Sequence, residues 1–303
     1  MKVLALIVSY NGEETICHVL NSCLTDKRIS ANISTLVIDN ASTDGTLAAI
    51  ESLNFKPLEI IQMPRNVGVA TAYNIGLKKA KALGVRWLFL LDQDSGCLHC
   101  CLRHLLEDID MLEKRGEKVG AICACARSWI FPDTIHFPYY WKDNALVTAQ
   151  IDLHSSELVT PIDSSLSSGT LYNVEALSAL GGFREDYFID FVDHECHLRL
   201  RKAEWGIWWH KHALLFHRLG ISQKMTKEGL WVEHAPYRYY YMGRNMFEGL
   251  RRLGGKSAAR RFIRQDVFGH IQRLRRHGKS PWKSSFFLIK GVIDGYLGRG
   301  GSM

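Results

Sequence analysis

The feature that most constrains this chain is an apolar run that stops at two carboxylates. Residues 87–91 read WLFLL, and Asp92, Gln93, Asp94 and Ser95 follow directly. Five consecutive apolar residues predict a strand buried on both faces, as in parallel sheets. Asp92 and Asp94 are two positions apart, so they can converge beyond the strand end and hold a divalent cation against phosphate oxygens. The alternative is an acidic turn that ends the strand, with Ser95 capping the next helix.

Strand-like and helical segments alternate before this run. The predicted strands cover residues 3–9, 34–40 and 58–62, and the predicted helices cover 15–24, 47–53 and a stretch ending at 81. This alternation predicts a parallel sheet with right-handed crossovers, in which ligands bind beyond the carboxyl ends of the strands. Asn11 and Asp39 follow two of these strands and are expected at the same edge as the paired acids. No Gly-x-Gly-x-x-Gly or Walker loop is present, so a cation or basic side chains must neutralise a bound phosphate.

The chain has no apolar run long enough for a membrane-spanning helix, and its cysteines do not form a zinc motif. No run of about 18 apolar residues occurs, and the N-terminal apolar stretch is too short for a signal peptide. We therefore expect a cytoplasmic protein whose eight cysteines are reduced thiols. Cys123 and Cys125 lie in an apolar run over residues 119–126, which predicts a core strand and not a metal site.

The net charge of +7 is unevenly distributed. From Arg244 to the end there are 14 Lys and Arg against 3 Asp and Glu, which leaves 24 against 28 in the preceding part. Helices are predicted over residues 237–253, 256–277 and 281–297, after a boundary near 221–233. We expect a catalytic domain over 1–220 and a helical, basic extension over 221–303. Such a tail favours an anionic partner, either a membrane or a nucleic acid.

The last predicted helix carries an apolar stripe beside its basic residues. Trp282, Phe286, Ile289, Val292 and Ile293 form the stripe. An apolar face beside lysines and arginines is more typical of an interfacial membrane helix than of a nucleic-acid-binding segment. The alternative is that the stripe packs on the body of the protein and leaves an ordinary solvated charged face.

Eight segments, taken in order, carry a family resemblance. They read IVSYNG from residue 7, VIDNASTDGT from 37, RNVGVA from 65, LLDQDS from 90, SGT from 168, FIDFVDHE from 188, HRLG from 217 and YYYMGRN from 239. Together they resemble the family 2, GT-A-fold glycosyltransferases that use nucleotide sugars. They are most similar to the bacterial rhamnosyltransferases that build surface polysaccharides such as O-antigen. The resemblance covers roughly residues 3–246, and the remaining tail matches nothing beyond its basic helical character.

The resemblance implies a fold and a reaction. The expected fold is α/β, with a Rossmann-like, mostly parallel central sheet flanked by helices and followed by the C-terminal helical basic extension. Residues 1–95 would form the nucleotide-binding half and residues 96–220 the acceptor half. The implied reaction is an inverting, single in-line displacement at the anomeric carbon. Mg²⁺ or Mn²⁺ would neutralise the diphosphate leaving group.

The resemblance also implies roles for individual residues. Nucleotide contacts are expected from Ser9, Tyr10, Asn11, Asp39, Arg65, Asn66, Gly68 and Asp92. The metal site is expected to be Asp94 with Asp92 and His217. A lid over the diphosphate is expected from His234, Arg238 and Arg244. Acceptor-side positions are Gly169, Asp190 and Glu195.

The general base is expected among three acids. An acceptor hydroxyl must lose its proton as it attacks, so a carboxylate has to lie within hydrogen-bond reach. Aligning residues 195–199 on the family's acidic-Leu-x-x-Arg run places Asp193 at the base position. Relatives often have Glu-Asp here, whereas this chain has Val192 before Asp193, so Asp190 and Glu195 stay open as alternatives.

The expected donor is dTDP-L-rhamnose. The expected acceptor is a saccharide that is linked to a lipid. The protein is then expected to bind peripherally at the inner face of the plasma membrane, where such a lipid would lie. One alternative is a UDP-sugar donor. Another is a non-catalytic carbohydrate- or nucleotide-binding partner in a synthase complex. A nucleic-acid partner is not expected.

Overall fold

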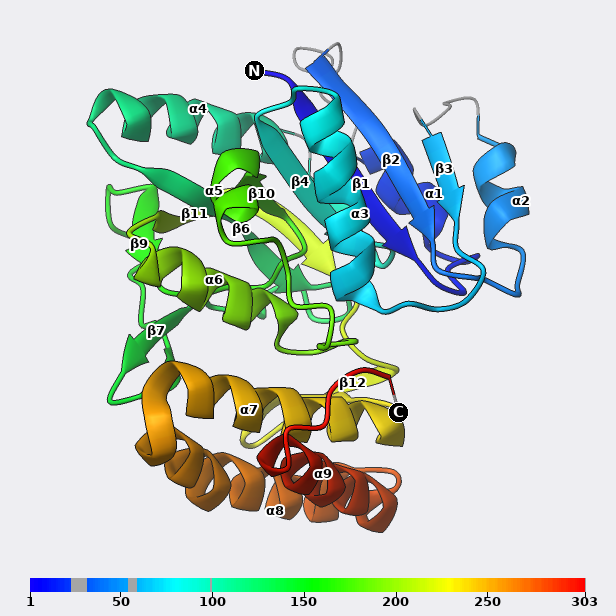
Figure 1. Ribbon diagram of the computed structural model, residues 1–303, viewed down its shortest axis with the longest axis vertical. Helices are drawn as coiled ribbons and strands as arrows, with labels where there is room; N and C mark the ends of the chain where they lie inside the picture. The colour runs from blue at the N-terminus through cyan, green and yellow to red at the C-terminus, as the bar shows by residue number, and fades with distance from the viewer. Residues whose placement is uncertain (23–31, 54–58, 99, 303) are drawn as a thin grey trace.

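A nine-stranded sheet forms the centre of the protein. The computed structural model describes residues 1–22, 32–53, 59–98 and 100–302. The strand order is β3-β2-β1-β4-β10-β6-β11-β5, with β9 paired to β11. The strands are β1 (Val3–Ser9), β2 (Ile33–Asp39), β3 (Glu59–Gln62), β4 (Trp87–Asp92), β5 (Ser95–Cys97), β6 (Val119–Ser128), β9 (Val159–Ile162), β10 (Thr170–Asn173) and β11 (Gly206–His217). Figure 1 shows this sheet surrounded by helices.

The sheet is mainly parallel, as predicted. β1, β2, β3 and β4 run parallel to one another, and β6 runs parallel to β11. β10 lies between β4 and β6 and is antiparallel to both, so β4 and β11 point the same way and end at one edge of the sheet. The predicted strand over residues 87–91 is fully buried. The polar residues that follow β4 and β11 therefore meet at this edge.

Alternation along the strands creates two apolar faces. Val3, Ala5 and Ile7 of β1 belong to one core cluster, and Leu4 and Leu6 belong to the other. The first face is covered by α1 (Ile16–Ser22), α2 (Thr46–Glu51) and α4 (Cys101–Lys114). The second face is covered by α3 (Val69–Ala82), α5 (Val174–Ala179) and α6 (Val192–Lys202). Helices on both faces explain why the strands are apolar throughout.

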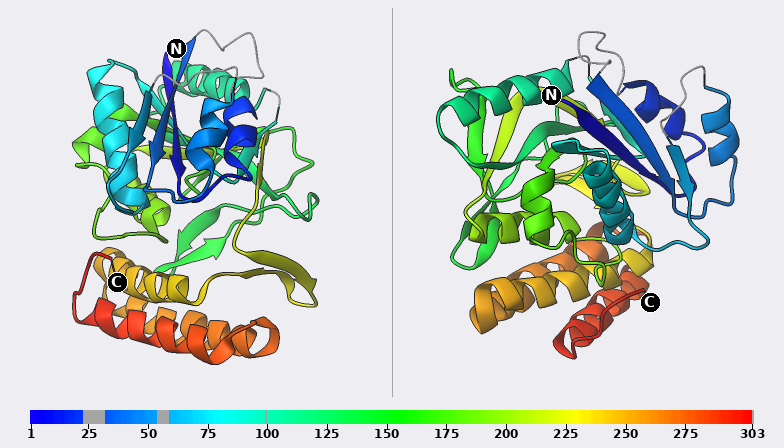
Figure 2. Two further views of the ribbon diagram at one scale, coloured as in Figure 1. Left: turned by 90° about the vertical axis from the view of Figure 1, so that its right-hand side faces the viewer. Right: turned by 45° about the horizontal axis from the view of Figure 1, so that its top comes forward.

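The C-terminal part adds a layer of helices beneath the sheet (Figures 1 and 2). It follows two hairpins, β7 (Tyr139–Lys142) with β8 (Ala145–Thr148) and β12 (Ser222–Thr226) with β13 (Gly229–Glu233). The layer consists of α7 (Pro236–Arg261), the π-helix η2 (Phe262–Val267), α8 (Phe268–His277) and α9 (Pro281–Tyr296). In the described part of the chain, no helix is long and apolar enough to cross a membrane.

The structure describes only some of the expected ends of helices, strands and domains. The helix end at Leu24 and the strand start at Leu58 lie outside the described residues. The helix break expected near residue 255 is present, since Gly255 has a φ of 76° inside α7. The expected boundary at residue 220 does not interrupt the core, because Trp231 and Tyr239 belong to the same apolar cluster as Leu4.

Glycines bring α7 and α9 close together. A Cβ on Gly291 of α9 would overlap the carbonyl oxygen of Tyr240, and one on Gly295 would lie 2.6 Å from the carbonyl oxygen of Arg244. On α7, a Cβ on Gly243 would overlap the carbonyl oxygen of Leu288. The two backbones therefore approach at a distance that only glycine permits.

We expect Gly291→Ala to lower the free energy of unfolding by about 2 kcal/mol, because the added methyl group forces two helix backbones apart. Urea denaturation would measure the change. Gly269→Ala in α8 is the matched control, since no atom from outside the local helix backbone lies within 4 Å of the added Cβ. The control should be neutral or slightly stabilising, because alanine favours a helix more than glycine does. Equal stability of the two variants would contradict the close packing.

Candidate active site

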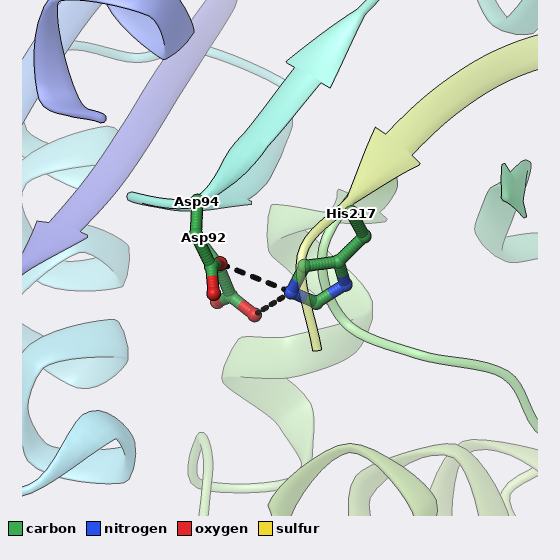
Figure 3. Close-up of side chains that lie close together, drawn as sticks. All are labelled: Asp92, Asp94 and His217. Atoms are coloured by element: carbon green, nitrogen blue, oxygen red, sulfur yellow. Dashed lines mark ion pairs between the residues drawn. The ribbon is translucent and has the colours of Figure 1, made fainter. Parts of the chain in front are cut away.

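Asp92, Asp94 and His217 meet at the common edge of β4 and β11. β4 ends at Asp92, and the chain then reverses into β5, which pairs antiparallel with β11 so that Ser95 lies opposite His217. The His217 Nε2 atom is 3.1 Å from Asp94 Oδ1 and 3.3 Å from Asp92 Oδ2. Figure 3 shows both carboxylates directed at this nitrogen. The predicted metal residues are therefore brought together by strand pairing.

The electrostatics of this cluster fit a divalent cation. Burial and the nearby Asp94 raise the pKa of Asp92, although His217 opposes this effect. Burial would lower the pKa of His217, but the carboxylates of Asp94 and Asp92 raise it overall. One ligand atom from each residue lies within 4.8 Å of the others. Two carboxylate oxygens and an imidazole nitrogen can hold a divalent cation, and a cation would relieve the repulsion between the acids.

The cluster opens into a cavity of about 500 Å³. This volume lies in the usual range for small-molecule sites. The walls come from the ends of β1 and β4, the start of α3, the loop before α6, the end of β11 and the first turns of α7. The predicted site residues on the walls are Tyr10, Asn66, Gly68, Asp92, Asp94, Asp190, Asp193, His217, His234 and Arg238. Two of the three candidate bases, Asp190 and Asp193, therefore line the same cavity as the paired acids after β4.

Four residues expected to contact the nucleotide are not among those that line this cavity: Ser9, Asn11, Asp39 and Arg65. Asp39 is 2% exposed, and both of its oxygens accept hydrogen bonds from Ser42. Asp39 therefore shapes the turn that carries Asn40, and Asn40 does line the cavity. Asn11 accepts a hydrogen bond from the backbone N–H of Thr43 and so ties two loops together.

Three further expected site residues do not line this cavity. Glu195 is fully buried and pairs with Arg199 and Arg252, so it does not face an acceptor. Gly169 is buried against Leu215 and Ala124 beneath the sheet edge, where its φ of 81° makes a turn into β10. Arg244 is 2% exposed, so it forms no lid. Each of these side chains or backbones is used for structure.

Arg244 and its neighbour support the loop that precedes the expected base. The Arg244 guanidinium donates to the backbone oxygens of Asp186 and Gly301. The Asn245 amide donates to the carbonyl oxygens of Ile189, at 2.7 Å, and Asp190, at 2.9 Å. Asp190 has a φ of 66°, and the next residue has a φ of 65°. Two consecutive left-handed residues without glycine are costly, and such strain concentrates at functional sites.

The pairing of the three acids separates their roles. The Asp190 carboxylate forms a two-point ion pair with Arg238, at 2.5 and 3.2 Å. Glu195 is held by its two arginines, as described above. Asp193 accepts hydrogen bonds from the backbone N–H of Ser167, at 3.2 Å, and of His194, at 2.8 Å. Within the described residues, no lysine or arginine pairs with Asp193, and the His194 Nε2 atom lies 3.9 Å from its Oδ1. Of the three candidate acids, Asp193 is therefore the one without an arginine partner.

Comparison with known proteins identifies the family. The family model for glycosyl transferase family 2 matches residues 5–152. The dTDP-rhamnosyl transferase RfbF of Shigella flexneri is 30% identical over 262 residues, which cover 82% of this chain and 80% of that protein. The chain belongs to glycosyl transferase family 2. It is therefore a glycosyltransferase.

Solved structures support the GT-A-like fold of this glycosyltransferase. The S. aureus TarS fragment 1–349 in complex with UDP-GlcNAc has a TM-score of 0.60 at 16% identity, covering 96% of this chain and 82% of that one. The mannosyltransferase PcManGT from Pyrobaculum calidifontis, in complex with GDP-Man and Mn²⁺, has a TM-score of 0.60 at 13% identity. It covers 98% of this chain and 88% of that one. At these identities the likeness concerns the fold alone.

Tyr73 lies between Asp92 and the Ser167 residue that binds Asp193. The sequence did not predict a role for this tyrosine. Its hydroxyl lies 3.2 Å from Asp92 Oδ1 and 3.2 Å from Ser167 Oγ, and the backbone of Ser167 donates to Asp193. Burial and the neighbouring Asp92 raise the pKa of Tyr73 well above its usual value, so the hydroxyl keeps its proton. Tyr73 lies in α3, and no motif in the sequence points to it. Only the fold brings it between the two acids.

We expect Tyr73→Phe to lower kcat about tenfold with little change in the donor KM, because losing a hydrogen bond to a charged group costs about 1.5–3 kcal/mol. Steady-state kinetics would separate the two parameters. Tyr172→Phe is the matched control, since among the described residues the buried Tyr172 hydroxyl has no hydrogen-bond partner. Its removal should leave kcat unchanged. A fall in both variants would point to general destabilisation and contradict a positioning role for Tyr73.

Proposed function

We propose that this glycosyltransferase moves L-rhamnose from dTDP-L-rhamnose onto a saccharide acceptor in surface polysaccharide synthesis. The observation that carries the proposal is the similarity to the dTDP-rhamnosyl transferase RfbF, which extends over 82% of the chain. The similar region includes far more of the chain than the segment matched by the family model. We further propose that the acceptor is lipid-linked and is met at the inner face of the plasma membrane.

We propose that Asp92, Asp94 and His217 hold Mg²⁺ or Mn²⁺. A bound cation supplies charge neutralisation for the diphosphate as it leaves. The β5–β11 pairing supports this proposal, because it sets His217 opposite Ser95, the residue after Asp94. The ion pair with Asp190 keeps the Arg238 guanidinium in the cavity wall, where a second positive charge can face the diphosphate.

We propose that Asp193 removes the proton from the acceptor hydroxyl. The acceptor oxygen then attacks the anomeric carbon, the bond to the diphosphate oxygen breaks, and the configuration inverts. The proton ends on Asp193, and the negative charge ends on the nucleoside diphosphate. The backbone N–H groups of Ser167 and His194 hold the carboxylate in one orientation for this step.

A UDP-sugar donor is the second candidate. The observation that favours it is the fold similarity to TarS, which was solved with UDP-GlcNAc. This support is weaker because the identity is 16%. A panel of dTDP-L-rhamnose, UDP-glucose, UDP-GlcNAc and GDP-mannose would separate the candidates, with release of the free nucleoside diphosphate as the readout. Turnover of dTDP-L-rhamnose is expected. Use of the UDP sugars with no turnover of dTDP-L-rhamnose would overturn the donor assignment.

A further inference from the structure

Helix α9 is turned so that its largest apolar side chains face solvent. Trp282 is 73% exposed, Phe286 63%, Ile289 46%, Ile293 52% and Tyr296 66%. We call these five residues the outer face of α9. The buried residues of α9 are mostly small or polar, namely Ser284, Ser285, Gly291, Asp294 and Gly295, with Leu288 as the large exception, and the half-buried Phe287 and Val292 pack beside them. A surface helix normally has the opposite arrangement, with its large apolar residues toward the core.

The rotation of α9 is fixed by its inner side. Gly291 and Gly295 lie against the backbone of α7, where no larger residue fits. Asp294 is 4% exposed and is held by the hydroxyl of Tyr240, the ammonium of Lys290 and the guanidinium of Arg299. Turning the helix to bury its outer face would break these contacts and place bulky side chains at the glycine positions. The exposed apolar surface is therefore a stable feature of the fold.

The surroundings of the outer face are basic. An arginine lies over the aromatic ring at each end, with Arg275 5.0 Å from the ring centre of Trp282 and Arg251 5.8 Å from that of Tyr296. The exposed Lys283 follows Trp282 directly. The only acid on α9 is Asp294, which is buried and paired. The outer face therefore presents apolar side chains and positive charge together.

Two occupants match an exposed apolar stripe of this length. The stripe has the alternating four- and three-residue spacing of a coiled coil, so a second copy of α9 is one occupant. In a symmetric pair, however, the exposed Lys283 would lie beside the seam on both helices, and α9 has no exposed acid to meet it. An anionic bilayer satisfies both components, because its headgroups attract the lysines and arginines while the apolar side chains enter the acyl boundary. Tryptophan and tyrosine at the two ends also suit the level of the headgroups.

We propose that the outer face of α9 docks this protein on an anionic membrane surface. The inference stands on the geometry of α9 and does not require the proposed donor or acceptor. Helix α9 is connected to the cavity through α7, which contributes residues to the cavity wall and also packs against α9. Tyr237, Arg238 and Met242 of α7 line the cavity, and Gly243 of the same helix packs against α9. A membrane bound at α9 would therefore lie one helix away from the cavity wall.

Flotation of the full-length protein with vesicles would test the proposal. Vesicles of phosphatidylcholine with roughly a third phosphatidylglycerol would be compared with pure phosphatidylcholine at about 0.15 M salt. We expect binding to the anionic vesicles, and a loss of at least about tenfold in the Trp282→Ser/Phe286→Ser double variant. Leu83→Ser/Leu158→Ser is the matched control, since both leucines are exposed on the body, at 41% and 46%. The control should bind like the parent protein.

A second variant keeps the proposal testable if the double variant does not fold. Lys283→Glu changes an exposed charge without touching the apolar side chains, and it should also weaken binding to anionic vesicles. Light scattering would show whether the parent protein is a dimer. A dimer that dissociates in the double variant, or a parent protein that ignores anionic vesicles, would overturn the membrane assignment. Unchanged release of nucleoside diphosphate by the variants would show that membrane binding at α9 can be lost while the catalytic site still works.

Discussion

Replacing Asp193 with asparagine is expected to lower kcat about a thousandfold, within the range assigned to general acid–base catalysis. Asparagine has nearly the same shape and can still accept a hydrogen bond from the Ser167 N–H, but it cannot take a proton from the acceptor hydroxyl. In the proposed mechanism the donor diphosphate lies at the cation held by Asp92, Asp94 and His217, so the dissociation constant of the donor should stay within about twofold. Transfer kinetics and direct titration with the nucleoside diphosphate would measure the two quantities separately.

Two neighbouring acids serve as controls for Asp193. Glu195→Gln should reduce stability first, because it leaves Arg199 and Arg252 around a buried position without their carboxylate. Asp190→Asn should weaken diphosphate binding, because it releases Arg238. If Asp193→Asn keeps more than about a tenth of the parent kcat while Asp190→Asn abolishes transfer, the base is Asp190 and the present assignment fails.

Replacing Asp94 with asparagine is expected to abolish metal-dependent transfer, with a fall in kcat/KM of about a thousandfold. The reason is that metal stabilisation of transition-state charge is worth several kcal/mol. Chelation of the parent protein with EDTA should have a similar effect, which added Mn²⁺ or Mg²⁺ reverses. Binding of Mn²⁺ followed by electron paramagnetic resonance gives a readout that does not depend on turnover. The variant should show at least about tenfold weaker Mn²⁺ binding.

Asp133→Asn is the matched control for the metal site. Asp133 is an exposed acid in a loop, and it does not belong to the Asp92, Asp94 and His217 group. This variant should bind Mn²⁺ and transfer sugar like the parent protein. Full transfer activity after chelation, together with no detectable Mn²⁺ binding, would show that the cluster works without a cation. Arg238 would then remain as the charge that faces the diphosphate.

Much of the site was predictable because it depends on local patterns. The apolar run before Asp92 predicts a buried strand, and the two-residue spacing predicts that both acids can point to one place. His217 was identified at the end of a second strand, and the structure places it against Asp94. The family resemblance placed Asp193 at the base position, and the structure places it on the cavity wall.

The roles of Glu195, Arg244 and Tyr73 all depend on partners that are distant along the chain. Arg252, which pairs with the buried Glu195, is 57 positions away along the chain. The backbone oxygens that bind the Arg244 guanidinium are 57 and 58 positions away. Tyr73 was overlooked because its partner Ser167 lies 94 positions along the chain. No spacing rule reports such partners. A charged residue in a motif can serve either the ligand or the scaffold, and only its neighbours in space decide which.

The amino-acid sequence alone determined the alternation of strands and helices, the paired acids and the amphipathic character of the last helix. These are properties of neighbouring residues, and backbone geometry translates them directly into strands, turns and helix faces. The tertiary structure decided which acid is free of arginine, which tyrosine joins the two acidic groups, and which side of α9 faces outward. Those outcomes depend on close packing and ion pairing between distant segments, because two backbones that touch at Gly291 leave little room for bulky side chains between the helices.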